Sequence, residues 1–226
     1  MQITNKVATE VASHEAIVRA AYKDSVGIWT WGIGITTSSG HSVERYIGNP
    51  QSHAKVMDVF RWALDKYAED VRKAFAGCEL TEEQSAAALS FHYNTGAILK
   101  ASWVKHFKNG DMAAAKKSFM NWKKPSEIIP RRKKERDLFF DGKWSNDGTI
   151  PEYTRLTKSH TPVWGSRVNI DAAQCFAPSE PIEPELPPAQ VTINGEVTPE
   201  NRNAFAALID AALSMFSRMI GGGKNG

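Results

Sequence analysis

The sequence predicts an α+β protein that is mostly helical, with a small β-hairpin or sheet lobe, a long connecting helix and a helical lobe. Three observations support this fold class. An amphipathic helical pattern opens the chain, a short segment rich in glycine, threonine and tryptophan follows it, and helical patterns then continue to about residue 140. A linker and an amphipathic C-terminal helix complete the architecture that we expect for the 226 residues.

The β lobe is expected directly after the first helix. Residues 3–20 predict that helix, because valines and alanines recur in them at three- and four-residue spacings. Residues 22–40 predict a hairpin or meander, since residues 24–27 form a turn signal and residues 28–31 alternate in polarity.

The helical lobe is expected from residue 51 onward. Residues 51–76 predict the long helix, with one apolar stripe and Gly77 as its stop. Thr81 and Gln84 form a capping-box pattern that opens the next helix, which we expect to run to about Asn94. Further helices are expected over residues 98–108, 112–123 (capped by Asp111) and 130–140.

The pattern weakens after residue 144. We expect one domain over residues 1–176, made of a core at 8–144 and an irregular extension at 145–176 with short strands packed on it. Prolines and glutamates at 177–190 are typical of a semi-rigid linker. Residues 191–226 predict a turn and an amphipathic helix. For its part at 199–220, packing on the domain, contact with a partner or a second copy, and binding to a membrane surface stay open.

Composition is that of an ordinary globular protein, with 42% hydrophobic and 23% charged residues and a formal net charge of +3. That small positive charge fits an anionic partner, such as a bacterial cell wall or nucleic acid, without selecting one. The N-terminus lacks the apolar stretch of a signal peptide, and no run of about 18 apolar residues occurs. We therefore expect neither a signal peptide nor a transmembrane segment.

Neither the cysteines nor the histidines predict a metal site. Cys78 and Cys175 lack metal-ligand spacing, and buried thiols are favoured over a disulfide between them. His41 and His53 also fit no ligand motif. We expect no metal and no cofactor.

Three residues could carry glycosidase chemistry. Glu15 lies near the end of the first predicted helix, Asp24 at the hairpin turn and Thr30 on the returning strand. Glycoside hydrolysis requires an acid that protonates the leaving oxygen and a carboxylate that activates water or attacks the sugar. A helix end and an adjacent hairpin can hold two such groups across a cleft. Taken alone, this spacing equally fits two solvated surface carboxylates.

The wider pattern resembles the phage-type lysozymes, glycoside hydrolase family 24. The resemblance covers roughly residues 8–144 and rests on blocks in a fixed order. The blocks are Glu15, Tyr22-Lys23-Asp24, Gly27, Thr30 and Gly32-Ile33-Gly34, then residues 80–84 and 90–96, then Asn109-Gly110-Asp111, Ala114-Ala115, Trp122, Pro130-Arg131-Arg132, Glu135 and Leu138-Phe139.

This resemblance implies a lysozyme-like two-lobed domain and an N-acetylmuramidase. Such an enzyme cleaves the β-1,4 bond between N-acetylmuramic acid and N-acetylglucosamine in peptidoglycan, by inversion. Glu15 matches the general acid, while Asp24 and Thr30 match the residues that hold and activate the attacking water. An inverting course implies carboxyl groups about 6.5–9.5 Å apart.

Five further positions match substrate-facing residues of the family: Gly34, Ile35, His92, Tyr93 and Asn94. For His92, a packed or capping role at a helix end is the alternative. Two positions depart from the family pattern, because Ala16 follows the acid in place of a glycine and Ile35 replaces a histidine. We expect the second departure to affect the stability of the β lobe more than catalysis.

Two groups of residues have both a structural and a functional interpretation. Trp29 and Trp31 could stack on sugars, but aromatic residues that flank a hairpin more often belong to the core. The basic run at residues 131–136 is expected to be a solvated helix face. Attraction to the anionic wall, or pairing of an arginine with Glu135 in the core, are the alternatives.

The resemblance implies an endolysin, present in the host cytoplasm before lysis and acting on the wall in the periplasm. Access to the wall would then depend on a separate membrane-permeabilising, holin-like protein. A virion-associated lysozyme that aids DNA entry is an alternative with the same chemistry. A catalytically inactive wall-binding module is an alternative of another class, which the intact Glu15, Asp24 and Thr30 disfavour. No nucleic-acid motif occurs, so no nucleic-acid partner is expected.

Overall fold

The computed structural model describes residues 1–176, so the expected linker at 177–190 and C-terminal helix at 191–226 lie outside the described residues. The helices are α1 (Asn5–Ser13), α2 (His53–Ala74), α3 (Glu82–Thr95), α4 (Ser102–Lys108), α5 (Met112–Phe119), α6 (Ile129–Asp141) and α7 (Ala172–Phe176). The strands are β1 (Val18–Lys23), β2 (Trp29–Gly32), β3 (Ile35–Thr36), β4 (Thr149–Tyr153) and β5 (Arg167–Asp171).

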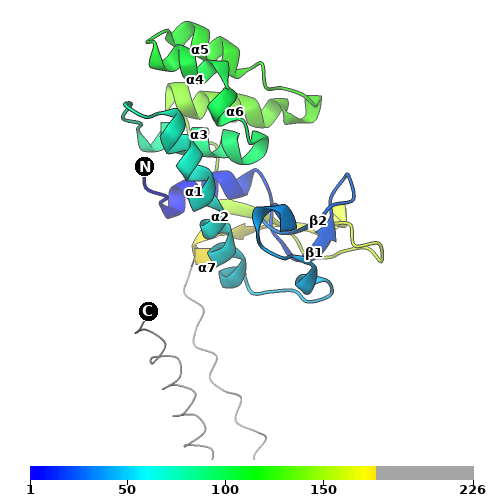
Figure 1. The fold of residues 1–226 in the computed structure, drawn as a ribbon. Coiled ribbons are helices and arrows are strands. Elements are labelled where there is room, and N and C mark those ends of the chain that lie inside the picture. The colour runs from blue at the N-terminus through cyan, green and yellow to red at the C-terminus, as the bar shows by residue number, and fades with distance from the viewer. Residues whose placement is uncertain (177–226) are drawn as a thin grey trace, which may run out of the picture. The chain divides into compact units, whose positions relative to one another are not determined.

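The α+β, mostly helical fold class is confirmed. Strands β1, β2 and β3 form an antiparallel sheet in that order, in the lobe at the lower right of Figure 1. Helices α3, α4, α5 and α6 form the other lobe, where α3 packs against α6 and α4 against α5. The long helix α2 connects the two lobes and packs against α3.

The first helix is shorter than expected. Instead of spanning residues 3–20, α1 ends at Ser13, and the backbone turns at Ala16, which has a φ of 70°. Tertiary pairing explains the change. The Ile17 N–H donates to the Pro151 carbonyl at 2.7 Å, and the Tyr153 N–H donates to the Ile17 carbonyl at 2.9 Å. These bonds favour extended backbone over the local helical pattern.

Several expected helix ends are confirmed by their caps. Thr81 and Gln84 form the reciprocal capping box at the start of α3. The Ala114 N–H donates to Asp111 Oδ1 at 2.9 Å, so Asp111 caps α5 as expected. The expected helix at 98–108 divides into a 3₁₀ turn at Ile98–Lys100 and α4. Helix α5 ends at Phe119, four residues earlier than expected.

The two hairpin tryptophans differ in environment. Trp31 is fully buried, stacks on Tyr46 at 4.1 Å between ring centroids and donates from Nε1 to the Arg19 carbonyl at 2.8 Å. Its assignment to the core is confirmed. Trp29 is half-buried, and its ring lies 5.2 Å from that of His160.

The extension at 145–176 packs on the domain through strands and one short helix. Strands β4 and β5 pair antiparallel, with Thr149 opposite Asp171 at one end and Tyr153 opposite Arg167 at the other. A parallel bridge between Ile17 and Glu152 joins this hairpin to the chain just before β1. Helix α1 contacts β4, and α2 contacts α7.

Two buried carboxylates connect the extension to the N-terminal half. Glu10 accepts hydrogen bonds from the Ser145 hydroxyl at 2.6 Å and from the Asn146 amide at 2.5 Å. Burial alone would raise the pKa of Glu10, but the hydrogen bonds from His14, Ser145 and Asn146 outweigh it and lower the pKa to about 2. On the extension itself, Glu152 accepts from Arg19 Nε at 2.8 Å and lies 2.9 Å from His53 Nε2.

The cysteines are thiols, with Cys78 half-buried and Cys175 buried. Burial raises the pKa of the Cys175 thiol to about 11, so it is protonated near neutral pH. Among the helices of residues 1–176, none has both the length and the apolar character that crossing a membrane requires.

Candidate active site

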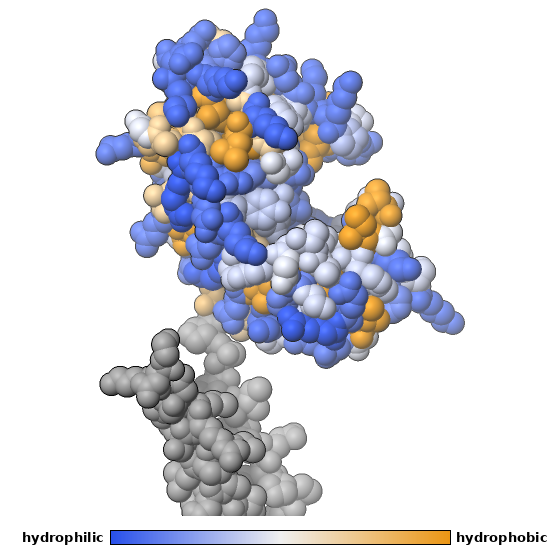
Figure 2. Space-filling model, in the orientation of Figure 1, coloured by the Kyte–Doolittle hydropathy of each residue, from blue (hydrophilic) through white to orange (hydrophobic). Residues whose placement is uncertain are grey.

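A pocket of about 640 Å³ contains two of the three residues singled out from the sequence, Glu15 and Asp24. It is lined by Glu15, Val18, Tyr22, Lys23, Asp24, Ser25, Tyr153, Thr157, Thr161, Pro162, Val163 and Trp164. The first six come from the turn after α1 and from the β1–β2 hairpin, and the last six come from the extension. On the face shown in Figure 2, the surface is largely hydrophilic and hollowed between the helical lobe and the β lobe.

The turn after α1 positions Glu15. Its N–H donates to the Ala12 carbonyl at 3.0 Å, which holds the residue against the C-terminal end of the helix. Its side chain is 21% exposed, and Oε1 accepts from Arg131 Nη1 at 2.5 Å. Because the guanidinium holds Oε1, the orientation of the carboxyl group is fixed, and Oε2 is left outside this ion pair.

Arg131 is itself part of a buried network. It donates from Nε to Glu135 at 2.8 Å and from Nη2 to the Ser90 carbonyl at 3.1 Å. Burial opposes the charge of Arg131, but the carboxylates of Glu15 and Glu135 outweigh it and raise the pKa of the guanidinium. Arg131 is therefore a fixed cation that joins α6, α3 and the catalytic candidate Glu15.

The expectation of a solvated basic face on α6 is wrong for Arg131 and Arg132, which are buried and paired with Glu135. The alternative, an arginine paired with Glu135 in the core, is confirmed. The two lysines that follow, Lys133 and Lys134, are exposed as expected. The sequence could not separate these positions, because the α6 side chains around them are polar on every side.

Asp24 is held by its own turn. One carboxylate oxygen, Oδ1, accepts from the Val26 N–H at 3.0 Å and from the Ile28 N–H at 2.9 Å. The Gly27 N–H donates to the Asp24 carbonyl at 3.1 Å, and Gly27 has a φ of 85°, a conformation that favours glycine. Within residues 1–176, Asp24 Oδ2 accepts no hydrogen bond from protein and is available to a ligand or water.

Thr30 lies on β2, opposite Tyr22 of β1 in the sheet register. It is 4% exposed, and its hydroxyl donates to the Ile28 carbonyl at 3.2 Å. Thr30 is not among the residues that line the pocket, although its cross-strand partner Tyr22 is. Thr30 therefore neighbours the pocket-lining Tyr22 on the sheet without itself lining the pocket.

Gly34 and Tyr93 lie beside Glu15. A Cβ built on Gly34 would be 3.5 Å from Glu15 Oε2 and 3.6 Å from Tyr93 Cε1. The Tyr93 hydroxyl donates to the Ile33 carbonyl at 2.5 Å. Burial, and then the Glu15 carboxylate, raise the pKa of Tyr93 well above its ordinary value, so its phenol stays neutral.

The structure does not bring the other three expected substrate residues to Glu15. Ile35 is 2% exposed, so its side chain belongs to the core of the β lobe. His92 is 4% exposed, and its Nδ1 accepts from the Ile98 N–H at 3.4 Å, which fits the packed, capping alternative. Asn94 accepts from Arg132 Nη2 at 2.6 Å and lines a different pocket, next to Trp122.

Sequence reasoning missed the half of the pocket that the extension supplies. The sequence predicts no function for residues 145–176, yet Tyr153 and Trp164 form an aromatic part of the pocket wall. Trp164 is 81% exposed. A lone tryptophan among Thr, Pro and Gly residues was the available signal, because such a segment offers no helical or strand pattern to bury it.

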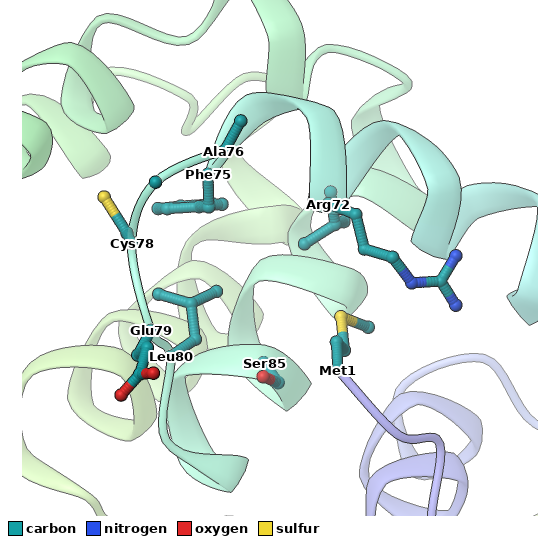
Figure 3. A pocket seen from close by; sticks show the side chains of 10 residues that line it. Met1, Arg72, Phe75, Ala76, Cys78, Glu79, Leu80 and Ser85 are labelled. Carbon is teal, nitrogen blue, oxygen red and sulfur yellow. The ribbon is translucent and has the colours of Figure 1, made fainter.

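A second pocket, of about 450 Å³, lies where α2 ends and the chain turns toward α3 (Figure 3). It is lined by Met1, Val71, Arg72, Phe75, Ala76, Gly77, Cys78, Glu79, Leu80 and Ser85. Glu79 is the one carboxylate among these lining residues, so the pocket lacks the paired carboxylates of glycosidase chemistry. Within residues 1–176, no group of three or more His, Cys, Asp or Glu side chains is arranged to hold a metal ion.

Comparisons with known proteins show sequence and fold similarity to one family. The sequence model of the phage lysozyme family matches residues 12–135. The endolysin of Salmonella phage P22 is 30% identical over 146 residues, which are 62% of this chain and 98% of that protein. The endolysin from Escherichia coli O157:H7 phage FAHEc1 has a similar structure, with a TM-score of 0.59, 22% identity and coverage of 65% of this chain and 98% of that one. A P22 lysozyme mutant superposes with a TM-score of 0.53 at 29% identity, over 62% of this chain and 98% of that one.

Proposed function

The chain belongs to the phage lysozyme family, and we propose that it hydrolyses the β-1,4 bond between N-acetylmuramic acid and N-acetylglucosamine with Glu15 as general acid. The observation that carries this proposal is the presence of Glu15 and Asp24 in one pocket, each fixed by hydrogen bonds. Two carboxyl groups around one glycosidic bond are the minimum that this reaction requires.

In this mechanism Glu15 protonates the leaving oxygen from Oε2. Its other oxygen, Oε1, is held by Arg131, so the carboxyl group has one oriented and one reactive oxygen. The absence of a side chain at Gly34 leaves room beside Oε2, because a Cβ there would come within 3.5 Å of it.

Asp24 and Thr30 hold the attacking water. Asp24 Oδ1 is occupied by two backbone N–H groups, so Oδ2 is the oxygen that takes the proton of the water. The Thr30 hydroxyl donates its hydrogen to the Ile28 carbonyl, which leaves the lone pairs of Oγ1 to accept from water. A water between the acid and the base corresponds to an inverting reaction.

Gly34 and Tyr93 are the substrate-facing residues that we retain beside Glu15. Tyr93 keeps a neutral phenol and an apolar ring next to the acid, which suits contact with an uncharged sugar. Since Ile35 and His92 are buried and Asn94 is paired with Arg132, we assign them structural roles.

The biological role that fits this enzyme is that of an endolysin, which accumulates in the host cytoplasm and degrades the wall from the periplasm at lysis. In that role it depends on a holin-like partner that permeabilises the membrane. The 30% identity to the P22 endolysin over 98% of that protein favours this role over that of a virion-associated lysozyme or an inactive wall-binding module.

The proposal is tested by a turbidity assay on Gram-negative cells with permeabilised outer membranes. Glu15→Gln keeps the shape of the side chain but cannot donate the proton, so the clearing rate should fall at least about a thousandfold. Glu127→Gln, on an exposed residue outside the pocket, should clear the cells like the wild type.

The released fragments give a second readout. Mass spectrometry should find reducing ends on the muramic acid units after wild-type digestion. Anhydro-muramic ends, or normal clearing by a folded Glu15→Gln variant, would contradict the mechanism.

A further inference from the structure

We propose that the extension at residues 145–176 adds a sugar-binding subsite to the catalytic pocket, in which the Trp164 ring stacks on a pyranose ring of the glycan strand. This inference rests on the proposed hydrolysis of peptidoglycan, because it places the sugar next to Glu15 and Asp24.

The subsite lies outside the part of the chain that the family model matches, which ends at residue 135. Six of the twelve residues that line the catalytic pocket follow that boundary, from Tyr153 to Trp164. The chain thus builds half of the pocket wall from an addition to the matched domain. A ligand that reaches Glu15 through this pocket meets the extension on the way.

Trp164 presents an unusually large apolar surface at this wall. Its side chain is 81% exposed, although tryptophan is buried in most folded proteins. The ring packs against Tyr153 in a T-shaped arrangement, with ring centroids 5.6 Å apart and an angle of 89° between the rings. Most of the ring surface stays exposed, so a ligand that covers it removes apolar area from water.

The wall around Trp164 is held in place before any ligand arrives. The Lys23 N–H donates to the His160 carbonyl at 2.7 Å, which ties the extension to β1. The Ser166 hydroxyl donates to the Val163 carbonyl at 2.7 Å and accepts from the Arg155 N–H at 3.1 Å, on either side of Trp164. A wall ordered in advance loses little conformational entropy on binding.

The chemistry of the wall matches a sugar. A pyranose ring has apolar C–H faces and a rim of hydroxyl groups, so it binds where an aromatic face adjoins hydroxyl partners. Thr161 supplies such a partner at this wall: its Oγ1 shares a hydrogen bond with Thr157 Oγ1 at 2.8 Å and keeps further capacity for a sugar hydroxyl. Thr157 Oγ1 is already occupied by Ser159 Oγ, Thr161 Oγ1 and the Thr161 N–H. The pocket's one lysine, Lys23, is the sole cationic side chain among its lining residues, so the wall is not built for an anionic ligand.

The first test measures hydrolysis of soluble peptidoglycan fragments. Trp164→Ala should raise KM about tenfold and change kcat by less than about twofold, as expected for loss of an aromatic contact that binds the substrate equally well in the ground state and in the transition state. Trp164→Phe should recover most of the affinity. Trp62→Ala is the matched control, because Trp62 is 39% exposed on α2 and lies outside the pocket.

The second test separates binding from catalysis. Binding of a peptide-free N-acetylglucosamine hexamer is compared between Glu15→Gln and the double variant Glu15→Gln/Trp164→Ala, by calorimetry. The double variant should bind about tenfold more weakly. Equal Kd values would overturn the subsite, and so would a defect that occurs only with peptide-bearing fragments. If wild-type protein fails to cleave peptidoglycan, the proposed function is wrong, but the two Kd values still decide the subsite.

Discussion

The two walls of the catalytic pocket are built on opposite principles. The wall that belongs to the matched family region fixes its polar groups, since Arg131 holds Glu15 and two backbone N–H groups hold Asp24. The wall from the extension fixes its backbone and leaves an aromatic face to solvent at Trp164. Under the proposed function, the first arrangement suits a reaction, which requires atoms at set positions, and the second suits binding, which requires contact area.

The two walls also differ in how they are anchored. The family wall depends on the charges of Arg131 and Glu135, which are paired with each other and, through Arg131, with Glu15, the proposed general acid. The extension depends on two buried carboxylates: Glu10 of α1, which binds the start of the extension at Ser145, and Glu152 of β4, which binds Arg19. Substitutions at these anchors should therefore show which residues the enzymatic activity requires and which the free energy of unfolding requires.

The largest effect is expected from Arg131→Met. It removes the cation from Glu15 and from the buried Glu135, so the free energy of unfolding should fall by about 3–5 kcal/mol, the usual cost of breaking a buried ion pair. Residual folded protein should also be less active, because Glu15 loses its orientation. Urea denaturation and turbidity assays measure the two effects, with exposed Lys133→Met as the control on the same helix. A loss below about 1 kcal/mol would show that the network does not hold the site.

A smaller effect, restricted in pH, is expected from Glu10→Gln. The pKa of Glu10 is lowered from 4.5 to about 2 in the folded protein, so its carboxylate stabilises the fold above pH 4.5 and this contribution is lost as pH falls toward 2. The pKa difference corresponds to about 3 kcal/mol near neutral pH.

Denaturation of wild type and Glu10→Gln over this range of pH measures the contribution. The difference between them should be full at pH 7 and shrink between pH 4.5 and about 2. A difference that does not depend on pH would assign the loss to packing. Glu69→Gln, at an exposed position on α2, should show no such dependence.

The smallest effect is expected from Ala16→Gly. Ala16 has a φ of 70°, a conformation that costs a non-glycine residue about 1–2 kcal/mol. Glycine removes this strain but loses more conformational entropy on folding, by about 0.5–1 kcal/mol, so the variant should be more stable by less than about 1 kcal/mol. Ala113→Gly, on an exposed position of α5, should have the opposite sign. Clear destabilisation of Ala16→Gly in thermal melts would contradict the strain at this turn.

Most of the fold could be predicted because its signals are local. The capping box at Thr81 and the Asp111 cap depend on neighbouring residues in the sequence. The long helix and the hairpin turn also depend on local patterns. The end of α1 could not be predicted, since it is set by pairing of Ile17 with a strand more than 130 residues later in the chain. Local periodicity carries no information about such a partner.

The candidate site divides in the same way. Glu15 and Asp24 could be found because they belong to a compact signature that resembles a known family. The burial of Arg131 and Arg132 could not, because two arginines in a basic run give no sign of which faces the core. The aromatic wall was missed for a related reason, since Trp164 reaches the pocket only through the folding of the extension onto β1.

One measurement tests both walls together. The ¹⁵N-labelled Glu15→Gln variant is titrated with an N-acetylglucosamine hexamer and followed by NMR. The signals of the Trp164 indole N–H and of the amides in the Asp24 turn should shift along a single binding curve. The Trp164→Phe variant, which lacks the indole, assigns the indole signal. The indole signals of Trp62, outside the pocket, and of the fully buried Trp103 should stay in place. Shifts confined to the Asp24 turn, with the Trp164 signal unchanged at saturation, would contradict the claim that the extension forms part of the substrate site.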